Sequence, residues 1–120
     1  TRPGLGRARV ARDQYQLQLE KQKSDIEFEV QGIVLELKAK ARIIDSSARY
    51  RNLTEKRVAS ETRRYRQGLV GSEWLFNYRR ELANAKSAEI QAIVEYKIAL
   101  ARLDRIMGNS PAVPRVRKPS

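Results

Sequence analysis

The stretch YRQGLVGSEWLF, residues 65–76, decides the fold because it places two glycines in a chain that otherwise consists mainly of helix formers. A glycine inside a helix costs about 1 kcal/mol relative to alanine, so two glycines three residues apart indicate a break rather than a continuous helix. All four prolines lie near the two ends of the chain. One turn therefore divides two long helices.

Local chemistry predicts where each helix ends. Gly68 suits a left-handed cap on the first helix, Ser72 suits the N-cap of the second, and Gly108 suits the end of the second. The sequence thus predicts five segments: a flexible lead over residues 1–6, a long helix over 7–67, a tip turn over 68–72, a second helix over 73–107, and a disordered, proline-containing basic tail over 108–120.

Mostly apolar residues recur about every 3.5 positions on both sides of the turn, which is typical of a coiled-coil seam. Arg51 and Thr54 fill weaker positions in the first row, and Glu89 is the polar member of the second. We therefore predict an all-α fold, a long antiparallel helical hairpin with one helix about twice as long as the other. The first row is Val30, Ile33, Leu37, Ala41, Ile44, Ala48, Val58 and Tyr65, and the second is Leu75, Tyr78, Leu82, Ala85, Ala92, Tyr96, Ala99, Leu103 and Ile106.

A second apolar set lies to one side of the seam in the later helix and consists of Ile90, Val94, Ile98 and Ala101. This set makes the apolar surface wider than a contact between two helices needs, which argues for further helices. We expect the chain to self-associate into a homodimer or a higher oligomer. We also expect residues 7–30 of the long helix to extend past the end of the shorter one.

The chain is strongly basic, with 25 Lys and Arg against 14 Asp and Glu and a net charge of +11. The excess is confined to residues 1–12, 49–66 and 110–120, rather than spread along one face that could follow a phosphate backbone. We therefore expect no nucleic-acid partner. The middle segment holds a basic patch, Lys56, Arg57, Arg63, Arg64 and Arg66, near a helix C-terminus, where cations are favoured.

The residue types needed for most catalytic and metal sites are missing. The chain has no Cys and no His, so it lacks a thiolate nucleophile, the commonest metal ligand and the usual near-neutral proton shuttle. No run of 18 apolar residues indicates a membrane-spanning helix. We expect no enzyme activity, no catalytic residues, no metal site and no cofactor.

Several of these features together resemble the second helical repeat of the TolC-like outer-membrane efflux protein family. They are a Gly-Arg-Ala segment from Gly6, a long polar helix, the motif Tyr65-Arg-Gln-Gly68-Leu69-Val70, and a leucine-containing helix that closes with Leu100-Ala-Arg-Leu103 before Gly108. The resemblance covers about residues 6–109. Only one of the family's two repeats is present, so the resemblance implies that the chain is part of a longer protein.

The resemblance implies a conduit rather than an enzyme. Members of the family are homotrimers whose helices form a tunnel across the periplasm, so this chain would be a wall segment of that tunnel in the bacterial cell envelope. Its tip would dock a periplasmic adaptor protein and, through it, an inner-membrane pump. The implied tip residues are Tyr65, Gly68, Leu69, Val70 and Ser72, and the entrance-lining candidates are Trp74 and Asn77, where some relatives carry aspartates.

Two other functions remain open from the residues alone. A coiled-coil scaffold would use the seam as its partner surface and would give Leu69 and Val70 no role. A basic helical nucleic-acid binder would show affinity that falls steeply with salt.

Overall fold

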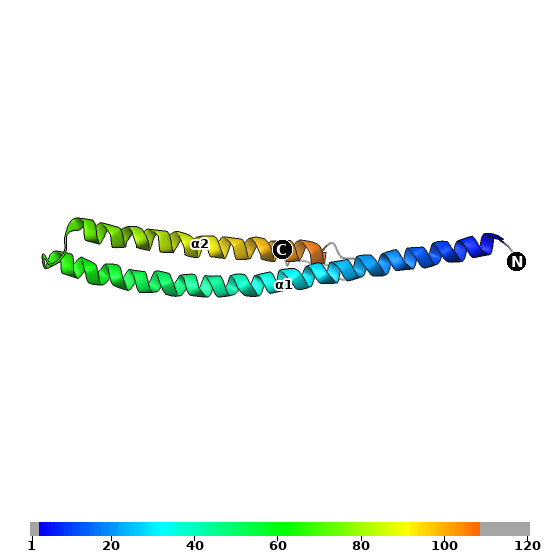
Figure 1. Ribbon diagram of the computed structural model, residues 1–120, viewed down its shortest axis with the longest axis horizontal. Helices are drawn as coiled ribbons and strands as arrows, with labels where there is room; N and C mark the ends of the chain where they lie inside the picture. Colours follow the sequence, from blue (N-terminus) through cyan, green and yellow to red (C-terminus); the bar gives the residue numbers. More distant parts are fainter. Residues whose placement is uncertain (1–2, 109–120) are drawn as a thin grey trace, which may run out of the picture. The chain divides into compact units, whose positions relative to one another are not determined.

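The computed structural model describes residues 3–108, which form two α-helices and no strand (Figure 1). Helix α1 spans Pro3–Arg66 and has 64 residues, and helix α2 spans Ser72–Gly108 and has 37. The chain divides into two compact units, one made of Thr1–Val34 and Arg102–Ser120 and the other of Leu35–Ala101. The predicted all-α hairpin, with one helix nearly twice as long as the other, is confirmed.

The Leu35–Ala101 unit is the hairpin itself. Its two helical stretches run side by side in opposite directions, as the ribbon shows (Figure 1) and as pairs of side chains that contact across the helices confirm. Arg51 reaches Glu89, and Lys40 reaches Glu95. From the first pair to the second, the residue number falls along α1 from 51 to 40 and rises along α2 from 89 to 95, so the two helices are antiparallel.

All four predicted helix boundaries are wrong by small amounts. Helix α1 begins at Pro3 rather than at residue 7, which costs no hydrogen bond because the first N–H groups of a helix have no intrahelical acceptor. It ends at Arg66 rather than at residue 67. Helix α2 begins at Ser72 and includes Gly108, one residue beyond the prediction at each end. Residues 1–2 of the predicted lead and 109–120 of the predicted tail lie outside the described residues.

The turn at the end of α1 is a Schellman motif centred on Gly68. Gly68 has φ +77° and donates its N–H to the carbonyl of Tyr65 over 3.0 Å. Leu69 donates its N–H to the carbonyl of Arg64, also over 3.0 Å. These are the two bonds that define the motif, and they satisfy carbonyls that the helix end would otherwise leave unpaired. The predicted left-handed cap at Gly68 is confirmed.

The N-cap of α2 is Gly71 rather than Ser72. The carbonyl of Gly71 accepts the N–H of Leu75 over 3.3 Å, and this is the first hydrogen bond of the helix. The cap is the residue whose carbonyl takes that bond while its own backbone is still outside the helix. Glycine is an acceptable cap, so Ser72 becomes the first helical residue and the prediction that it caps the helix is wrong.

The seam of the hairpin is built from small residues and one buried hydroxyl. Ala85, Ala92 and Ala99 are all buried and recur every seven residues along α2. On α1, Thr54 has no exposed surface, and its hydroxyl donates to the carbonyl of Tyr50 over 2.8 Å, so no polar group is left unpaired. Leu75, near the turn, is the one large side chain buried on α2 among the described residues, and the three alanines allow the two helices to approach closely along the rest of the seam.

Two residues of the predicted α1 row do not lie in the seam. Ala41 and Tyr65 are exposed, whereas Lys40, half-buried, lies one position before Ala41. The half-buried Lys40, Ser47 and Glu61 and the buried Thr54 recur every seven residues, so one of the two rows of α1 in the seam is polar. The other half-buried row of α1 is Leu37, Ile44, Arg51 and Val58. The prediction failed at Ala41 because it followed apolar identity. Tyr65 keeps the seven-residue spacing of Arg51 and Val58, but it lies in the last turn of α1 and is exposed.

One ion pair crosses the seam at half-buried positions. The Nε of Arg51 lies 2.8 Å from the Oε2 of Glu89, and a second nitrogen of Arg51 lies 3.2 Å from Glu55 on its own helix. The hydrogen bond to Glu89 raises the pKa of Arg51, so the guanidinium is charged. Alanine rows alone tolerate sliding along the helix axis, whereas this pair fits only one register.

In the other unit the long helix starts without packing partners. Every residue of 4–25 is exposed, and Ile26 is the first half-buried position of α1. Ile33 is buried, and Leu103 and Ile106 of α2 are half-buried in the same unit. The sequence predicts that residues 7–30 extend past the end of the shorter helix, and over residues 7–25 no side chain is buried against the described part of the chain.

Glycine substitutions test the role of the turn. Gly68→Ala should lower the free energy of unfolding by about 1 kcal/mol, because only glycine adopts a left-handed backbone without strain. Gly32→Ala is the matched control inside α1, where a methyl group meets open space, and it should raise the free energy of unfolding by about 0.5 to 1 kcal/mol. Urea unfolding followed by circular dichroism measures both, and the same sign for the two variants would contradict the assignment of Gly68.

Paired substitutions test the ion pair. Glu89→Leu and Arg51→Leu each leave one charge half-buried without its cross-seam partner, so each should destabilise the hairpin. The double variant removes both charges and should be more stable than either single variant, as thermal unfolding would measure. If the losses of the two single variants simply add in the double variant, the two side chains act independently and the pair does not hold the register.

Candidate docking site at the hairpin tip

The tip presents an exposed leucine on a hydrogen-bonded turn. Leu69 is 63% exposed, and the neighbouring Val70 is half-buried. In a Schellman motif the residue at the position of Leu69 commonly packs on the last turn of its helix. Here the last turn of α1 carries Arg63 and Arg64 instead of apolar residues, and Leu69 is exposed to solvent. The turn therefore holds an apolar side chain outward in a fixed backbone geometry.

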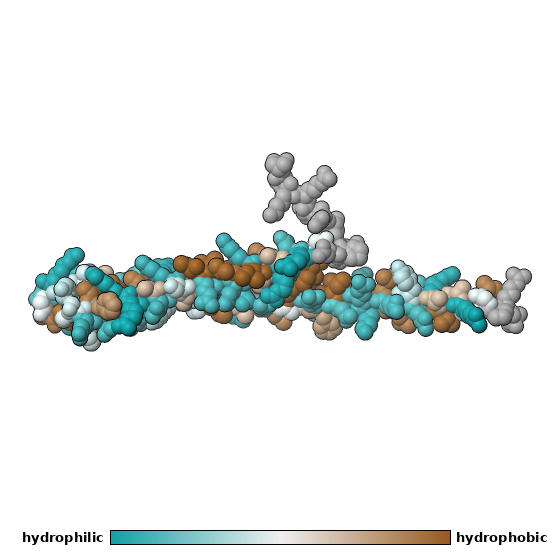
Figure 2. Space-filling view, turned by 90° about the horizontal axis from the view of Figure 1, so that it is seen from above, coloured by the Kyte–Doolittle hydropathy of each residue, from teal (hydrophilic) through white to brown (hydrophobic). Residues whose placement is uncertain are grey.

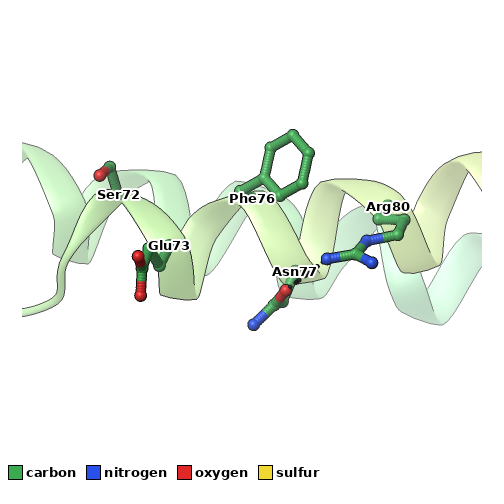
Figure 3. A pocket seen from close by; sticks show the side chains of 5 residues that line it. All are labelled: Ser72, Glu73, Phe76, Asn77 and Arg80. Atoms are coloured by element: carbon green, nitrogen blue, oxygen red, sulfur yellow. Dashed lines mark hydrogen bonds between the residues drawn. The ribbon is translucent and has the colours of Figure 1, made fainter.

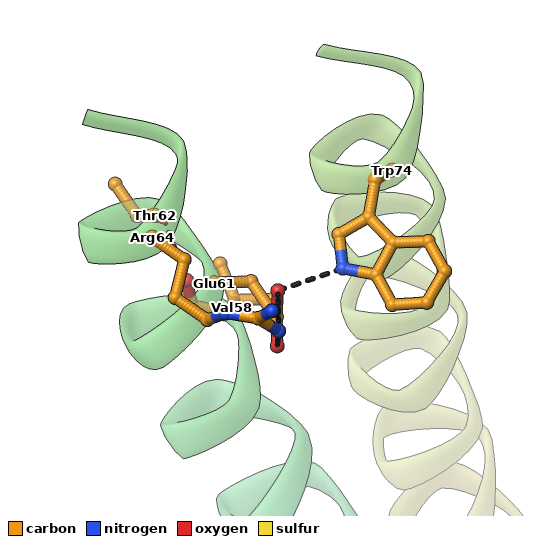
Figure 4. Close-up of polar contacts among 5 residues, drawn as sticks. All are labelled: Val58, Glu61, Thr62, Arg64 and Trp74. Atoms are coloured by element: carbon orange, nitrogen blue, oxygen red, sulfur yellow. Dashed lines mark hydrogen bonds and ion pairs between the residues drawn. The ribbon is translucent and has the colours of Figure 1, made fainter. Parts of the chain in front are cut away.

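Trp74 ties the start of α2 to the end of α1. Its indole N–H donates to Oε2 of Glu61 over 2.7 Å, and Arg64 contacts both oxygens of the same carboxylate (Figure 4). The Trp74 ring also meets Tyr78 edge to face, with ring centres 5.4 Å apart. The two helices are thus joined beside the turn by a polar contact and an aromatic one.

The outer side of the first turns of α2 carries a shallow open hollow lined by Ser72, Glu73, Phe76, Asn77 and Arg80 (Figure 3). The guanidinium of Arg80 lies 5.2 Å from the centre of the Phe76 ring and donates to the side-chain oxygen of Asn77 over 2.9 Å. These contacts lie within one helix and fix the position of Arg80. The prediction that Trp74 and Asn77 line an entrance stays a prediction.

The basic patch extends across the turn onto α2, which sequence reasoning missed. Arg79, Arg80 and Lys86 are exposed, and the antiparallel fold sets their part of α2 beside the part of α1 that holds the predicted patch. These cations could have been predicted from the expected hairpin, because folding the chain at Gly68 brings residues 79–86 next to the end of α1. Of the predicted patch, Arg64 is paired with Glu61, whereas Lys56, Arg57, Arg63 and Arg66 are exposed without a carboxylate partner among the described residues.

A second apolar face runs along α2, away from the seam. Ile90, Val94 and Ile98 are 62%, 48% and 56% exposed, and Figure 2 shows hydrophobic surface along this part of α2. Ile90 and Val94 each stand two residues from the buried Ala92, which is about half a turn around a helix. The predicted apolar set therefore lies on the face opposite the seam rather than beside it.

The described residues offer no metal cluster. Within residues 3–108 no group of three or more Asp and Glu side chains is arranged to hold an ion. Neither α1 nor α2, over those same residues, is apolar enough along its length to cross a membrane.

Comparison of the chain with protein-family models, with curated proteins and with solved structures finds no match.

Glu61→Ala tests the link beside the turn. Without the carboxylate, Trp74 and Arg64 lose a common partner, so the free energy of unfolding should fall by about 1 kcal/mol. Trp74 is the only tryptophan, so its emission should shift to longer wavelength and become easier to quench with acrylamide. Glu73→Ala is the matched control in the first turn of α2 and should leave the emission unchanged. An unchanged spectrum in the Glu61 variant would show that the indole bond is absent in solution.

Proposed function

We propose that the chain is a wall segment in the α-helical tunnel of a TolC-like outer-membrane efflux or secretion channel and that its tip docks a periplasmic adaptor protein. The observation that carries the proposal is the presence of two opposite apolar faces on α2. The sequence resemblance supplies the identity of the tunnel, the homotrimeric parent, the link to an inner-membrane pump and the location in the bacterial cell envelope. The structure supports the part of the proposal in which α2 packs between two neighbouring helices.

A hairpin surrounded by water needs one apolar face on each helix, and α2 already uses its alanine face against α1. Its other face exposes three large aliphatic side chains, each of which gains about 1.5 to 3 kcal/mol when fully buried. In a closed ring of helices each helix has neighbours on two sides. The second face of α2 therefore fits a wall position, with the next helix of the ring covering Ile90, Val94 and Ile98.

The tip supports the docking part of the proposal. Leu69 is exposed, and two backbone hydrogen bonds and the Trp74–Glu61 contact hold the turn in place. A preorganised apolar side chain loses little conformational freedom when it enters a partner's pocket. The tip therefore has the form of a docking element as well as a chain reversal.

The scaffold alternative is weakened by the seam. A scaffold would offer the seam to a partner, but α2 of the same chain already fills it with Ala85, Ala92 and Ala99. The nucleic-acid alternative is weakened by the position of the cations, because Arg63 and Arg80 stand on the outer faces of two different helices. Neither alternative gives a role to Leu69.

Two variants of the channel that contains this segment test separately the role of α2 in assembly and the role of the tip in adaptor binding. Replacement of Ile90, Val94 and Ile98 by Gln removes the second apolar face and should abolish trimer assembly, measured by sedimentation. Leu69→Asp with Val70→Asp places charge at the tip and should leave assembly and helix content unchanged while adaptor binding and transport fail.

The reverse results would contradict the proposal in distinct ways. Normal assembly of the Gln variant means that the second face of α2 is not a wall contact. Loss of assembly in the Asp variant means that the tip is structural. Normal transport in the Asp variant places adaptor contact elsewhere on the hairpin.

A further inference from the structure

The part of the hairpin nearest the turn carries cations that the chain does not neutralise. Residues 56–86 contain eight Lys and Arg and three Glu. Glu61 is paired with Arg64 and Trp74, and Glu81 accepts a hydrogen bond from the hydroxyl of Tyr50, which raises the pKa of Tyr50. Only Glu73 lacks such a partner among the described residues. Seven cations therefore remain exposed without a carboxylate: Lys56, Arg57, Arg63, Arg66, Arg79, Arg80 and Lys86.

These seven cations, called here the tip belt, do not share one face. Arg63 stands two residues from the half-buried Glu61, so it points away from the seam on α1. Arg80 stands two residues from Tyr78 and from Leu82, both half-buried, so it points away from the seam on α2. The two helices thus carry cations on opposite outer faces, and the belt surrounds the hairpin behind Leu69.

An apolar end surrounded by cations is complementary to one kind of partner surface. Leu69 needs an apolar pocket, and the belt behind it needs carboxylates around the rim of that pocket. We infer that the adaptor surface that receives this tip is an apolar socket rimmed by Asp and Glu side chains, so that docking is steered by charge and completed by burial of Leu69. This inference rests on the proposed function and names the chemistry of the partner.

Two other anionic partners fit the belt less well. A phosphate backbone follows one face of a protein, whereas the belt occupies opposite faces. Lys56 lies ten residues, or about 15 Å, before the end of α1 at Arg66. A flat anionic membrane that touches Leu69 would therefore be farther from Lys56 than the Debye length of about 8 Å at physiological salt. A socket that surrounds the tip reaches both the leucine and the more distant cations.

The test uses the whole chain and purified helical hairpins of periplasmic adaptor proteins, chosen to lack tryptophan and to carry either acidic or basic tips. Trp74 is the only tryptophan of the chain and lies beside the turn, so its fluorescence reports binding directly. Acidic-tipped hairpins should bind, and their Kd should rise about tenfold or more between low and physiological salt. Leu69→Asp should abolish binding at every salt concentration.

A matched pair of charge variants separates the belt from net charge. Arg63→Gln with Arg80→Gln removes two belt cations and should raise the Kd at low salt about tenfold. Arg42→Gln with Lys97→Gln removes two exposed cations outside the belt and should leave the Kd unchanged. Equal effects of the two pairs would mean that only net charge matters and would overturn the inference.

The remaining outcomes distinguish this inference from the proposed function. If basic-tipped hairpins bind as tightly as acidic ones, or binding is independent of salt, docking stands and the acidic socket is wrong. If no adaptor hairpin binds under any condition, docking itself fails and the inference fails with it. Tighter binding to vesicles of phosphatidylglycerol than to any hairpin would replace the protein partner with a membrane surface.

Discussion

The ion pair between Arg51 and Glu89 is the interaction on which the arrangement of the hairpin depends. The alanines of α2 recur every seven residues, so a shift of one heptad would place alanine against the same α1 row again. The ion pair breaks that degeneracy together with the Lys40–Glu95 and Tyr50–Glu81 contacts, because each joins one residue of each helix. With the register fixed, the turn falls at Gly68–Gly71, and Trp74 comes within reach of Glu61.

The helices and most of the seam could be predicted from the sequence because period, glycine and proline are local signals. The buried residues of α2 followed the predicted row, and Gly68 took the predicted left-handed conformation. Ala41 was misplaced because apolar identity was followed where the neighbouring Lys40 takes the half-buried position, and Tyr65 was misplaced because it lies in the last turn of α1. The N-cap moved from Ser72 to Gly71 because cap choice depends on where the chain completes its reversal, which no single residue specifies.

The tip was predictable only in part. Leu69 and Val70 were recognisable as apolar residues in a turn, but their different exposure depends on the geometry of the Schellman motif. The cations of α2 were missed because they join the basic patch only after the chain folds back. The position of the second apolar face opposite the seam likewise follows from which face α1 covers. These features link the fold to the proposal of a wall segment with a docking tip.

Cysteine accessibility tests the central claim, burial of the second face of α2 by a neighbouring helix, most directly. The chain has no Cys, so Val94→Cys introduces a single thiol on that face, and Lys56→Cys introduces a matched exposed thiol on α1. Reaction with a water-soluble maleimide should slow at position 94, and not at position 56, as protein concentration rises and the helices assemble. Equal reaction rates at the two positions at every concentration would contradict the account.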